Sequence, residues 1–184
     1  MIRIGFFIIL GAGLASAQDF EYGASGRITG KARYCGSGRP HAGGPSLDIN
    51  NGCGTCIYAA RGGTAYYYGG CRNFCSNGDG CNGAAGNYVQ IYHTAGYKTR
   101  YLHGLAGTQV TGTVSESRKI LKMGSTGGSG ASHLHQDIWR NGTRLTAWLN
   151  SVPPCYSTVT RGYNIPYNFP SISAPANNSP WGCN

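Results

Sequence analysis

The residue pattern in this chain that most directly suggests chemistry is a pair of histidines, His133 and His135, separated by one residue. Side chains at positions i and i+2 of a β-strand project from the same face, so both imidazoles would point the same way. One ring could then bind a metal ion while the other lies beside the open position on that metal. The pair alone is a weak signal, because histidines on a surface or in a core produce it as well.

A carboxylate in apolar surroundings, Asp48, is a second candidate ligand. It lies between Leu47 and Ile49, where an acid needs a partner such as a metal ion or a set of backbone amides. His41 precedes it by a short loop that contains glycine. The chain has only five histidines and six acids, so any metal site must draw on a short set of residues. The local sequence leaves open whether Asp48 binds a metal or caps the backbone.

The elements that must position these side chains have the pattern of β-strands. Short runs of β-branched and aromatic residues alternate with Gly, Asn and Ser, and a helical period is nearly absent. We expect Tyr101 and His103 to share one face of such a strand. Residues 95–98 and Asn141-Gly142 are expected to form turns between strands. The expected strands are residues 56–59, 64–68, 88–93, 99–103, 119–123 and 133–139.

Changes in composition along the chain divide it into three expected segments. Residues 1–17 have a basic start, a short apolar run and an Ala-Ser-Ala exit, which predicts a signal peptide and a secreted, extracellular protein. An uncleaved anchor is the alternative, although the apolar run is shorter than the about 20 residues of a spanning helix. Residues 18–150 are expected to form one domain. Residues 151–184, rich in Pro, Asn, Tyr and Ser, are expected to wrap around it, with a short carbohydrate-binding appendage as the alternative.

Eight cysteines in an exported chain predict disulfides, with a pairing that the sequence does not reveal. A structural zinc site on Cys53-x-x-Cys56 and Cys71-x-x-x-Cys75 is the alternative. The net charge of +9 is spread along the chain and favours polyanions such as cell walls, nucleic acids or acidic glycans. Simple solubility is the other explanation for this charge.

Taken together, the chain resembles the lysostaphin-type (LytM-like) zinc endopeptidases of peptidoglycan over roughly residues 39–140. Four motifs in the right order carry the resemblance. They are Pro40-His41 leading to Leu47-Asp48-Ile49, the glycine-led segment 54–60, the two segments 86–93 and 96–103, and Met123-Gly124-Ser125-Thr126-Gly127 followed by Ser132-His133-Leu134-His135.

The resemblance implies a mainly β fold in which an antiparallel sheet with long loops and disulfides forms a narrow groove. It implies one Zn²⁺ per chain held by His41, Asp48 and His135. It also implies that His103 and His133 are catalytic, whereas His93 matches a position that is structural in such proteins.

Two departures from the family pattern stand out. The spacing between His41 and Asp48 is longer than usual, which resembles the β-lytic endopeptidase branch of the group. Gln136-Asp137 replaces the common aromatic–acid pair, and we expect this change to affect the floor of the groove more than the metal.

The function implied by the resemblance is a secreted zinc metalloendopeptidase that hydrolyses peptide bonds of bacterial peptidoglycan. The cut would fall in a cross-bridge or stem peptide at glycine or another small residue, by attack of a zinc-bound water. The alternative is a non-catalytic zinc-binding module for signalling or wall binding on the same scaffold. We expect the partners to be peptidoglycan peptides and the anionic cell wall, with no specific nucleic acid, no membrane and a monomeric chain.

Overall fold

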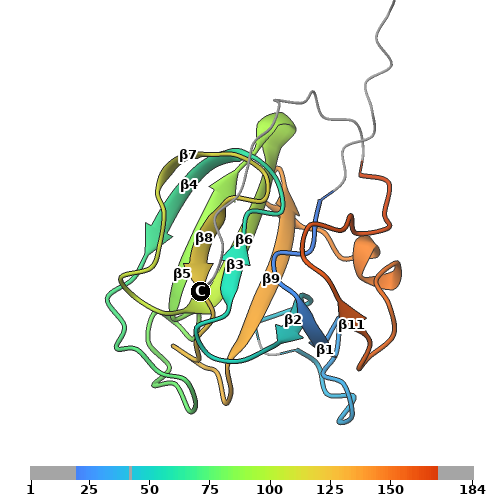
Figure 1. Cartoon of the computed structure of the whole chain (residues 1–184). Coiled ribbons are helices and arrows are strands. Elements are labelled where there is room, and N and C mark those ends of the chain that lie inside the picture. Colours follow the sequence, from blue (N-terminus) through green and yellow to red (C-terminus); the bar gives the residue numbers. More distant parts are fainter. Residues whose placement is uncertain (1–19, 42, 170–184) are drawn as a thin grey trace, which may run out of the picture.

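The computed structural model describes residues 20–41 and 43–169 (Figure 1). Short strands dominate it, with two short 3₁₀ helices, η1 (Thr94–Gly96) and η2 (Ala147–Asn150). The strands are β1 (Gly26–Gly30), β2 (Leu47–Asn50), β3 (Cys56–Tyr58), β4 (Gly63–Tyr68), β5 (Asn87–Tyr92), β6 (Tyr97–Gly104), β7 (Gly112–Val114), β8 (Lys119–Lys122), β9 (His133–Arg140), β10 (Thr143–Arg144) and β11 (Thr158–Val159).

Nine of these strands form one antiparallel sheet in the order β11-β1-β2-β9-β6-β5-β4-β7, with β10 added along β9. The remaining pair, β3 and β8, forms a separate two-stranded ribbon that lies against the sheet and contacts β5 and β6 (Figure 1). The predicted mainly β, antiparallel fold is confirmed. The expected turn at Asn141-Gly142 connects β9 to β10, and η1 occupies the expected connection before β6.

Alternation of side chains along β5 explains why the sheet has two different faces. Val89 and Ile91 are fully buried in the core, whereas the side chain of Tyr92 on the same strand is about half exposed. Each fully buried aliphatic side chain contributes roughly 1.5–3 kcal/mol of transfer free energy. The core therefore lies on the face that the β3–β8 ribbon covers, where Ile57 and Leu121 are also fully buried.

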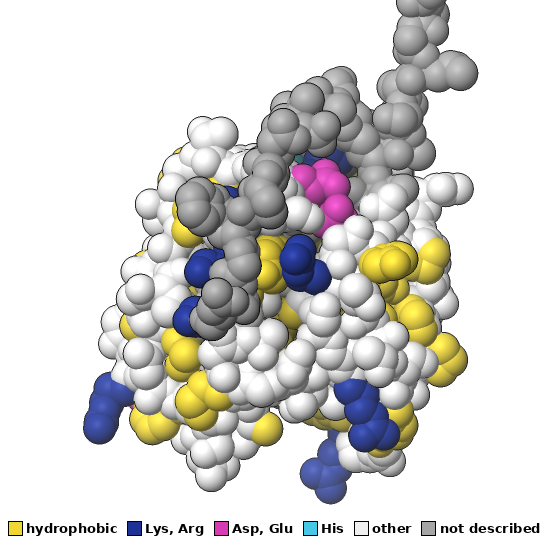
Figure 2. All heavy atoms as spheres, in the orientation of Figure 1, with side chains coloured by type: hydrophobic (Ala, Val, Ile, Leu, Met, Phe, Trp, Pro, Cys, Tyr) yellow, Lys and Arg dark blue, Asp and Glu magenta, His cyan; other side chains and the backbone are white. Residues whose placement is uncertain are grey.

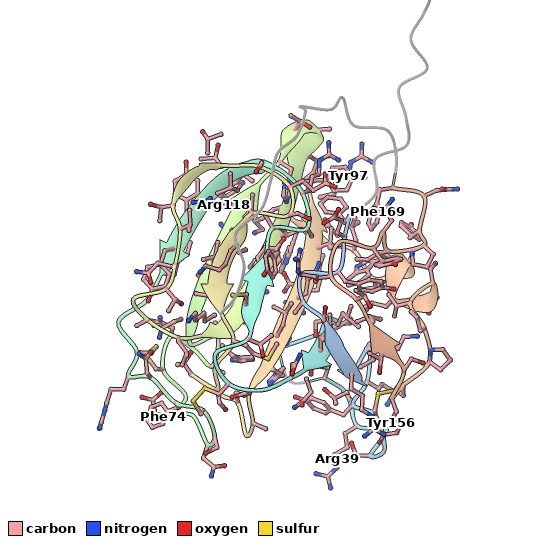
Figure 3. The ribbon with its side chains drawn as sticks, in the orientation of Figure 1. Arg39, Phe74, Tyr97, Arg118, Tyr156 and Phe169 are labelled. Atoms are coloured by element: carbon pink, nitrogen blue, oxygen red, sulfur yellow. A yellow bond between two sulfur atoms is a disulfide. The ribbon has the colours of Figure 1, made fainter. Side chains whose placement is uncertain are left out.

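The segment after residue 150 lies against the same sheet as far as the structure describes it. Cys155 forms a disulfide with Cys35, and β11 pairs with β1. Phe169 is buried, and its ring lies 6.3 Å from that of Tyr97 at the start of β6 (Figure 3). The boundaries 18–150 and 151–184 stay predictions, because residues 170–184 lie outside the described part of the chain.

The cysteines whose partners the structure describes are joined in disulfides: Cys35–Cys155, Cys53–Cys75 and Cys71–Cys81. Cys56 is disulfide-bonded as well. The alternative of a zinc site on these cysteines is wrong, because their sulfur atoms are used in S–S bonds and cannot act as thiolate ligands.

The predicted signal peptide, residues 1–17, lies outside the described residues. Among those described, no helix has the length and apolar character that crossing a membrane requires. Figure 2 shows Lys and Arg side chains scattered over the visible face rather than gathered in one patch, as the sequence indicates.

Candidate metal centre

Three neighbouring strands, β2, β9 and β6, form the scaffold of the site. Asp48 on β2 lies directly opposite His135 on β9, and Asn50 lies opposite His133. On the other side of β9, Leu102 of β6 is the register partner of His135. Residues that are far apart in the sequence are therefore brought together by strand pairing.

His41 completes this group from the loop between β1 and β2. Its Nε2 lies 2.5 Å from Oδ2 of Asp48, and the Nδ1 of His135 lies 3.3 Å from Oδ1 of the same carboxylate. The ring of Tyr34 packs on the His41 ring at 4.4 Å, and the hydroxyl of Ser46 lies 3.2 Å from His41 Nδ1. The imidazole of His41 is thus held in place from two sides.

The carboxylate of Asp48 is buried, with 3% of its surface exposed. Burial alone would raise its pKa, but the contacts with His135 and His41 and the charge of His133 outweigh this effect and hold the pKa well below its usual range. Asp48 is therefore ionised in the folded protein at any ordinary pH.

The donor set fits a divalent metal ion. Within the part of the chain that the structure describes, Oδ1 of Asp48 is buried and has no hydrogen-bond partner, although it faces imidazole nitrogens of His135 and His133. His41, Asp48 and His135 each offer one ligand atom, and these three atoms lie within 4.8 Å of one another. Two imidazoles and one carboxylate are a ligand set of catalytic zinc sites.

A second group of three shares one member with the first. His103, His133 and His135 also bring ligand atoms within 4.8 Å of one another. The rings of His103 and His133 lie 4.7 Å apart. The structure therefore brings together all five residues that the sequence singled out, His41, Asp48, His103, His133 and His135, while the division into ligands and catalytic groups stays a prediction.

His103 enters the site through a β-bulge. Between the pairs Val89–Tyr101 and Asn87–Gly104, β6 has one residue more than β5, and His103 has a φ angle of +66°. The extra residue turns its side chain toward the groove. The expectation that Tyr101 and His103 share a face is wrong, because Tyr101 is fully buried in the core and its hydroxyl accepts a hydrogen bond from the Ala60 amide.

Both histidines beside the candidate ligands are oriented by backbone carbonyls. His103 Nδ1 lies 2.9 Å from the Thr126 oxygen, and His133 Nδ1 lies 2.9 Å from the Ala131 oxygen. A carbonyl only accepts, so each Nδ1 carries a proton, and a neutral ring in this orientation has its lone pair on Nε2. Burial, with smaller effects of His133 and His135, lowers the pKa of His103 to about 3, which keeps that ring neutral.

A cavity of about 420 Å³ opens in front of these groups. One wall is made of small residues, namely Gly83, Ala84, Ala85, Gly128 and Gly130. Gly127 is required beside this wall, because its φ is +74° and a Cβ atom there would lie 2.3 Å from the Gly86 amide nitrogen.

Four residues around the site are not predicted from the sequence. Tyr34 and Ser46 contact His41, and Arg100 and Arg144 line the cavity. Arg100 could have been found by its spacing, because it lies two residues before Leu102 on the groove face of β6. Nothing in the sequence around Arg144 indicates that β10 folds back toward the site.

Two further predictions concern residues near the site. His93 lies apart from it: its Nδ1 lies 2.8 Å from the Gly62 oxygen, and its ring packs against Phe20. Asp137 pairs with Arg100 beneath the cavity, whereas Gln136 points to the opposite face and accepts a hydrogen bond from the Gly23 amide. The predicted effect of the Gln136-Asp137 pair on the groove floor therefore concerns Asp137 alone.

Solved structures with a similar fold include several peptidases. A zinc containing peptidase from Vibrio cholerae is 26% identical, with a TM-score of 0.50 over 70% of this chain and 39% of that one. A putative peptidase M23 from Pseudomonas aeruginosa is 21% identical, with a TM-score of 0.49 over 72% of this chain and 50% of that one. The chain thus spans half or less of the length of these two proteins.

The catalytic domain of the antimicrobial peptidase lysostaphin from Staphylococcus simulans is 24% identical, with a TM-score of 0.45 over 69% of this chain and 92% of that domain. Residues 41–147, more than half of the sequence, match the sequence model of Peptidase family M23. The resemblance inferred from the four motifs is confirmed, and the chain belongs to Peptidase family M23.

Proposed function

We propose that this chain is a secreted zinc metalloendopeptidase that hydrolyses peptide bonds in bacterial peptidoglycan. The observation that carries the proposal is that His41, His103, His133 and His135 line a single cavity and that Asp48 lies against His41 and His135. Membership of a peptidase family supports hydrolysis of peptide bonds. The similar Vibrio cholerae protein, described as a zinc containing peptidase, supports zinc as the metal.

The ligands in this proposal are His41, Asp48 and His135. Two neutral imidazoles and one carboxylate leave a bound Zn²⁺ with a net positive charge, which suits a site with one open position. An ion held by these residues would polarise the scissile carbonyl and would lower the pKa of the water bound to it to about 7.

His103 and His133 handle protons and developing charge in this proposal. Because a backbone carbonyl holds Nδ1 of each ring, each Nε2 can accept a proton from the attacking water. A ring protonated in this way can donate to the oxyanion or pass its proton to the leaving amine. The alternative of a non-catalytic zinc-binding module has no use for two histidines fixed in this manner.

The cavity wall and the surface charge bear on the substrate. Glycine and alanine leave room for a peptide backbone at Gly83, Ala84 and Gly128 but provide no pocket for a large side chain. This favours a cut at glycine or another small residue.

The net charge of +9 attracts the protein to anionic walls, an effect that added salt weakens. The disulfides suit an oxidising, extracellular location.

The test uses the purified, fully oxidised protein on Gram-positive cell walls. Turbidity should fall, a chelator should stop the fall, and added zinc should restore it. Mass spectrometry of the products should show new amino termini within cross-bridge or stem peptides. Wall binding without new termini, in zinc-loaded protein, would refute the enzyme and favour the binding module.

A further inference from the structure

Two arginines extend the candidate site along β6 and β9. Leu102 and His135 are register partners beside the candidate metal ligands, and the next pair on the same faces is Arg100 and Asp137. The Arg100–Asp137 pair therefore lies about 7 Å along the groove from the Leu102–His135 pair, because each residue of a strand adds about 3.3 Å. Arg144 on β10 reaches the same place, where its Nη2 lies 3.3 Å from Oδ2 of Asp137.

Asp137 cannot neutralise both guanidinium groups. It is fully buried, and it accepts hydrogen bonds from Arg100 Nε at 3.0 Å, from Arg100 Nη2, and from Trp139 Nε1 at 2.7 Å. One negative charge thus faces two permanent positive charges. Arg100 uses Nε and Nη2 on Asp137, which leaves Nη1 for another acceptor, and Nε of Arg144 is buried without a hydrogen-bond partner among the described residues.

The two guanidinium groups are held in place by their surroundings. The centre of each lies 4.9 Å from the ring of Trp139, and Nη1 of Arg144 donates to the Gly43 carbonyl. Lys98 adds a third positive charge over the same ring, at 4.6 Å. Such contacts fix the position of the cations but leave their charge uncompensated.

Both arginines line the same cavity as His41, His103 and His135. Among the described residues that line it, none is an Asp or a Glu. The cavity is therefore positive at this end. A planar guanidinium with free N–H groups matches a carboxylate better than any other common peptide group.

We infer that Arg100 and Arg144 form a subsite that binds a carboxylate of the peptide substrate beside the scissile bond. The inference rests on the proposed peptidase function and narrows it to peptides that carry a free carboxylate close to the cut. A separation of about 7 Å corresponds to roughly two residues of extended peptide. The carboxylate is either the chain terminus or an acidic side chain at that distance.

The test compares acetylated oligoglycine peptides that differ only in one carboxylate. One pair has a C-terminal acid or amide. Two further pairs have Glu or Gln near one end or the other, with an amidated terminus. In the zinc-loaded enzyme, the acid of at least one pair should have a kcat/KM about tenfold above its neutral partner, as expected for a charge-assisted hydrogen bond. The pair that shows the preference identifies the source of the carboxylate.

The variant Arg144→Gln should bring this ratio close to one, and Arg144→Lys, which keeps the charge and loses the planar fork, should give an intermediate ratio. The matched control is Arg72→Gln, which removes the same charge from an exposed position outside the cavity and should keep the wild-type ratio. Thermal unfolding checks that each variant is folded. An unchanged ratio in folded Arg144→Gln overturns the subsite, as does a ratio near one for every pair in the wild type.

Failure of the proposed function gives a different result. If the wild type cleaves none of the peptides, their dissociation constants are measured by calorimetry instead. Tighter binding of the acid than of its neutral partner, lost in Arg144→Gln and kept in Arg72→Gln, supports the subsite. Equal binding of acid and neutral peptides overturns it.

Discussion

Asp48 and His135 lie directly opposite each other on β2 and β9, and Oδ1 of the carboxylate is 3.3 Å from Nδ1 of the imidazole. The register of two paired strands therefore determines the geometry of the candidate metal centre. A register shift by one residue would move one of the two side chains to the opposite face of the sheet. The core residues Leu47 and Ile49, on either side of Asp48, make that shift costly, because they would become exposed.

The substitution Asp48→Ala should abolish zinc binding, since it removes the only charged member of the proposed ligand set. Zinc per folded chain, measured by atomic absorption after dialysis, should fall from about one to near zero. Asp79→Ala is the matched control, because Asp79 is an exposed acid that belongs to neither group of candidate ligands and does not line the cavity, so its loss should leave the zinc content unchanged. Stoichiometric zinc in Asp48→Ala would contradict the ligand assignment.

The two overlapping groups of three residues can be separated by comparing His41→Ala with His103→Ala. If His41, Asp48 and His135 bind the metal, the first variant should lose zinc and the second should retain it. His103→Ala and His133→Ala should each lower kcat about 10²- to 10⁴-fold, as expected for loss of a proton-transfer group. Zinc loss in His103→Ala together with zinc retention in His41→Ala would show that the second group is the binding site.

Some of this arrangement could be predicted from the sequence and some could not. The alternation of apolar and polar residues identifies strands such as 88–93, and the scarcity of histidines and acids limits the candidates to a few. The side of the strand on which His103 lies could not be predicted, because a β-bulge changes the alternation and the sequence around residue 103 carries no mark of it. The position of Arg144 could not be predicted either, because it depends on the pairing of β10 with β9, which places Arg144 opposite Trp139.

The stability of the protein should fall as the pH is lowered from about 6.5 to about 4, in part because of His93. Burial is the main cause that lowers the pKa of this residue to about 4 in the folded state, against an ordinary value of about 6.5. Between these values the unfolded chain binds a proton that the folded chain does not, so acid favours unfolding. The full shift corresponds to about 3 kcal/mol.

Urea unfolding of metal-depleted protein at pH 7 and pH 4 measures this contribution. His93→Gln keeps a polar group near Gly62 and Thr99 but does not titrate. The loss of unfolding free energy between the two pH values should therefore be smaller in the variant than in the wild type by about the same 3 kcal/mol. An equal loss in both proteins would show that His93 is already protonated, or solvated, in the folded state.

The disulfide between Cys35 and Cys155 should contribute more to stability than the one between Cys71 and Cys81. The first closes a loop with a sequence separation of 120 residues, and the second closes one of 10 residues. Loop-closure entropy predicts a cost of about 5 kcal/mol for removing the first and about 3 kcal/mol for removing the second. Urea unfolding of the two double Cys→Ala variants compares these costs. A larger loss for Cys71–Cys81 would mean that local packing around Asn87, which bonds to the backbone of Cys71, outweighs chain entropy in this fold.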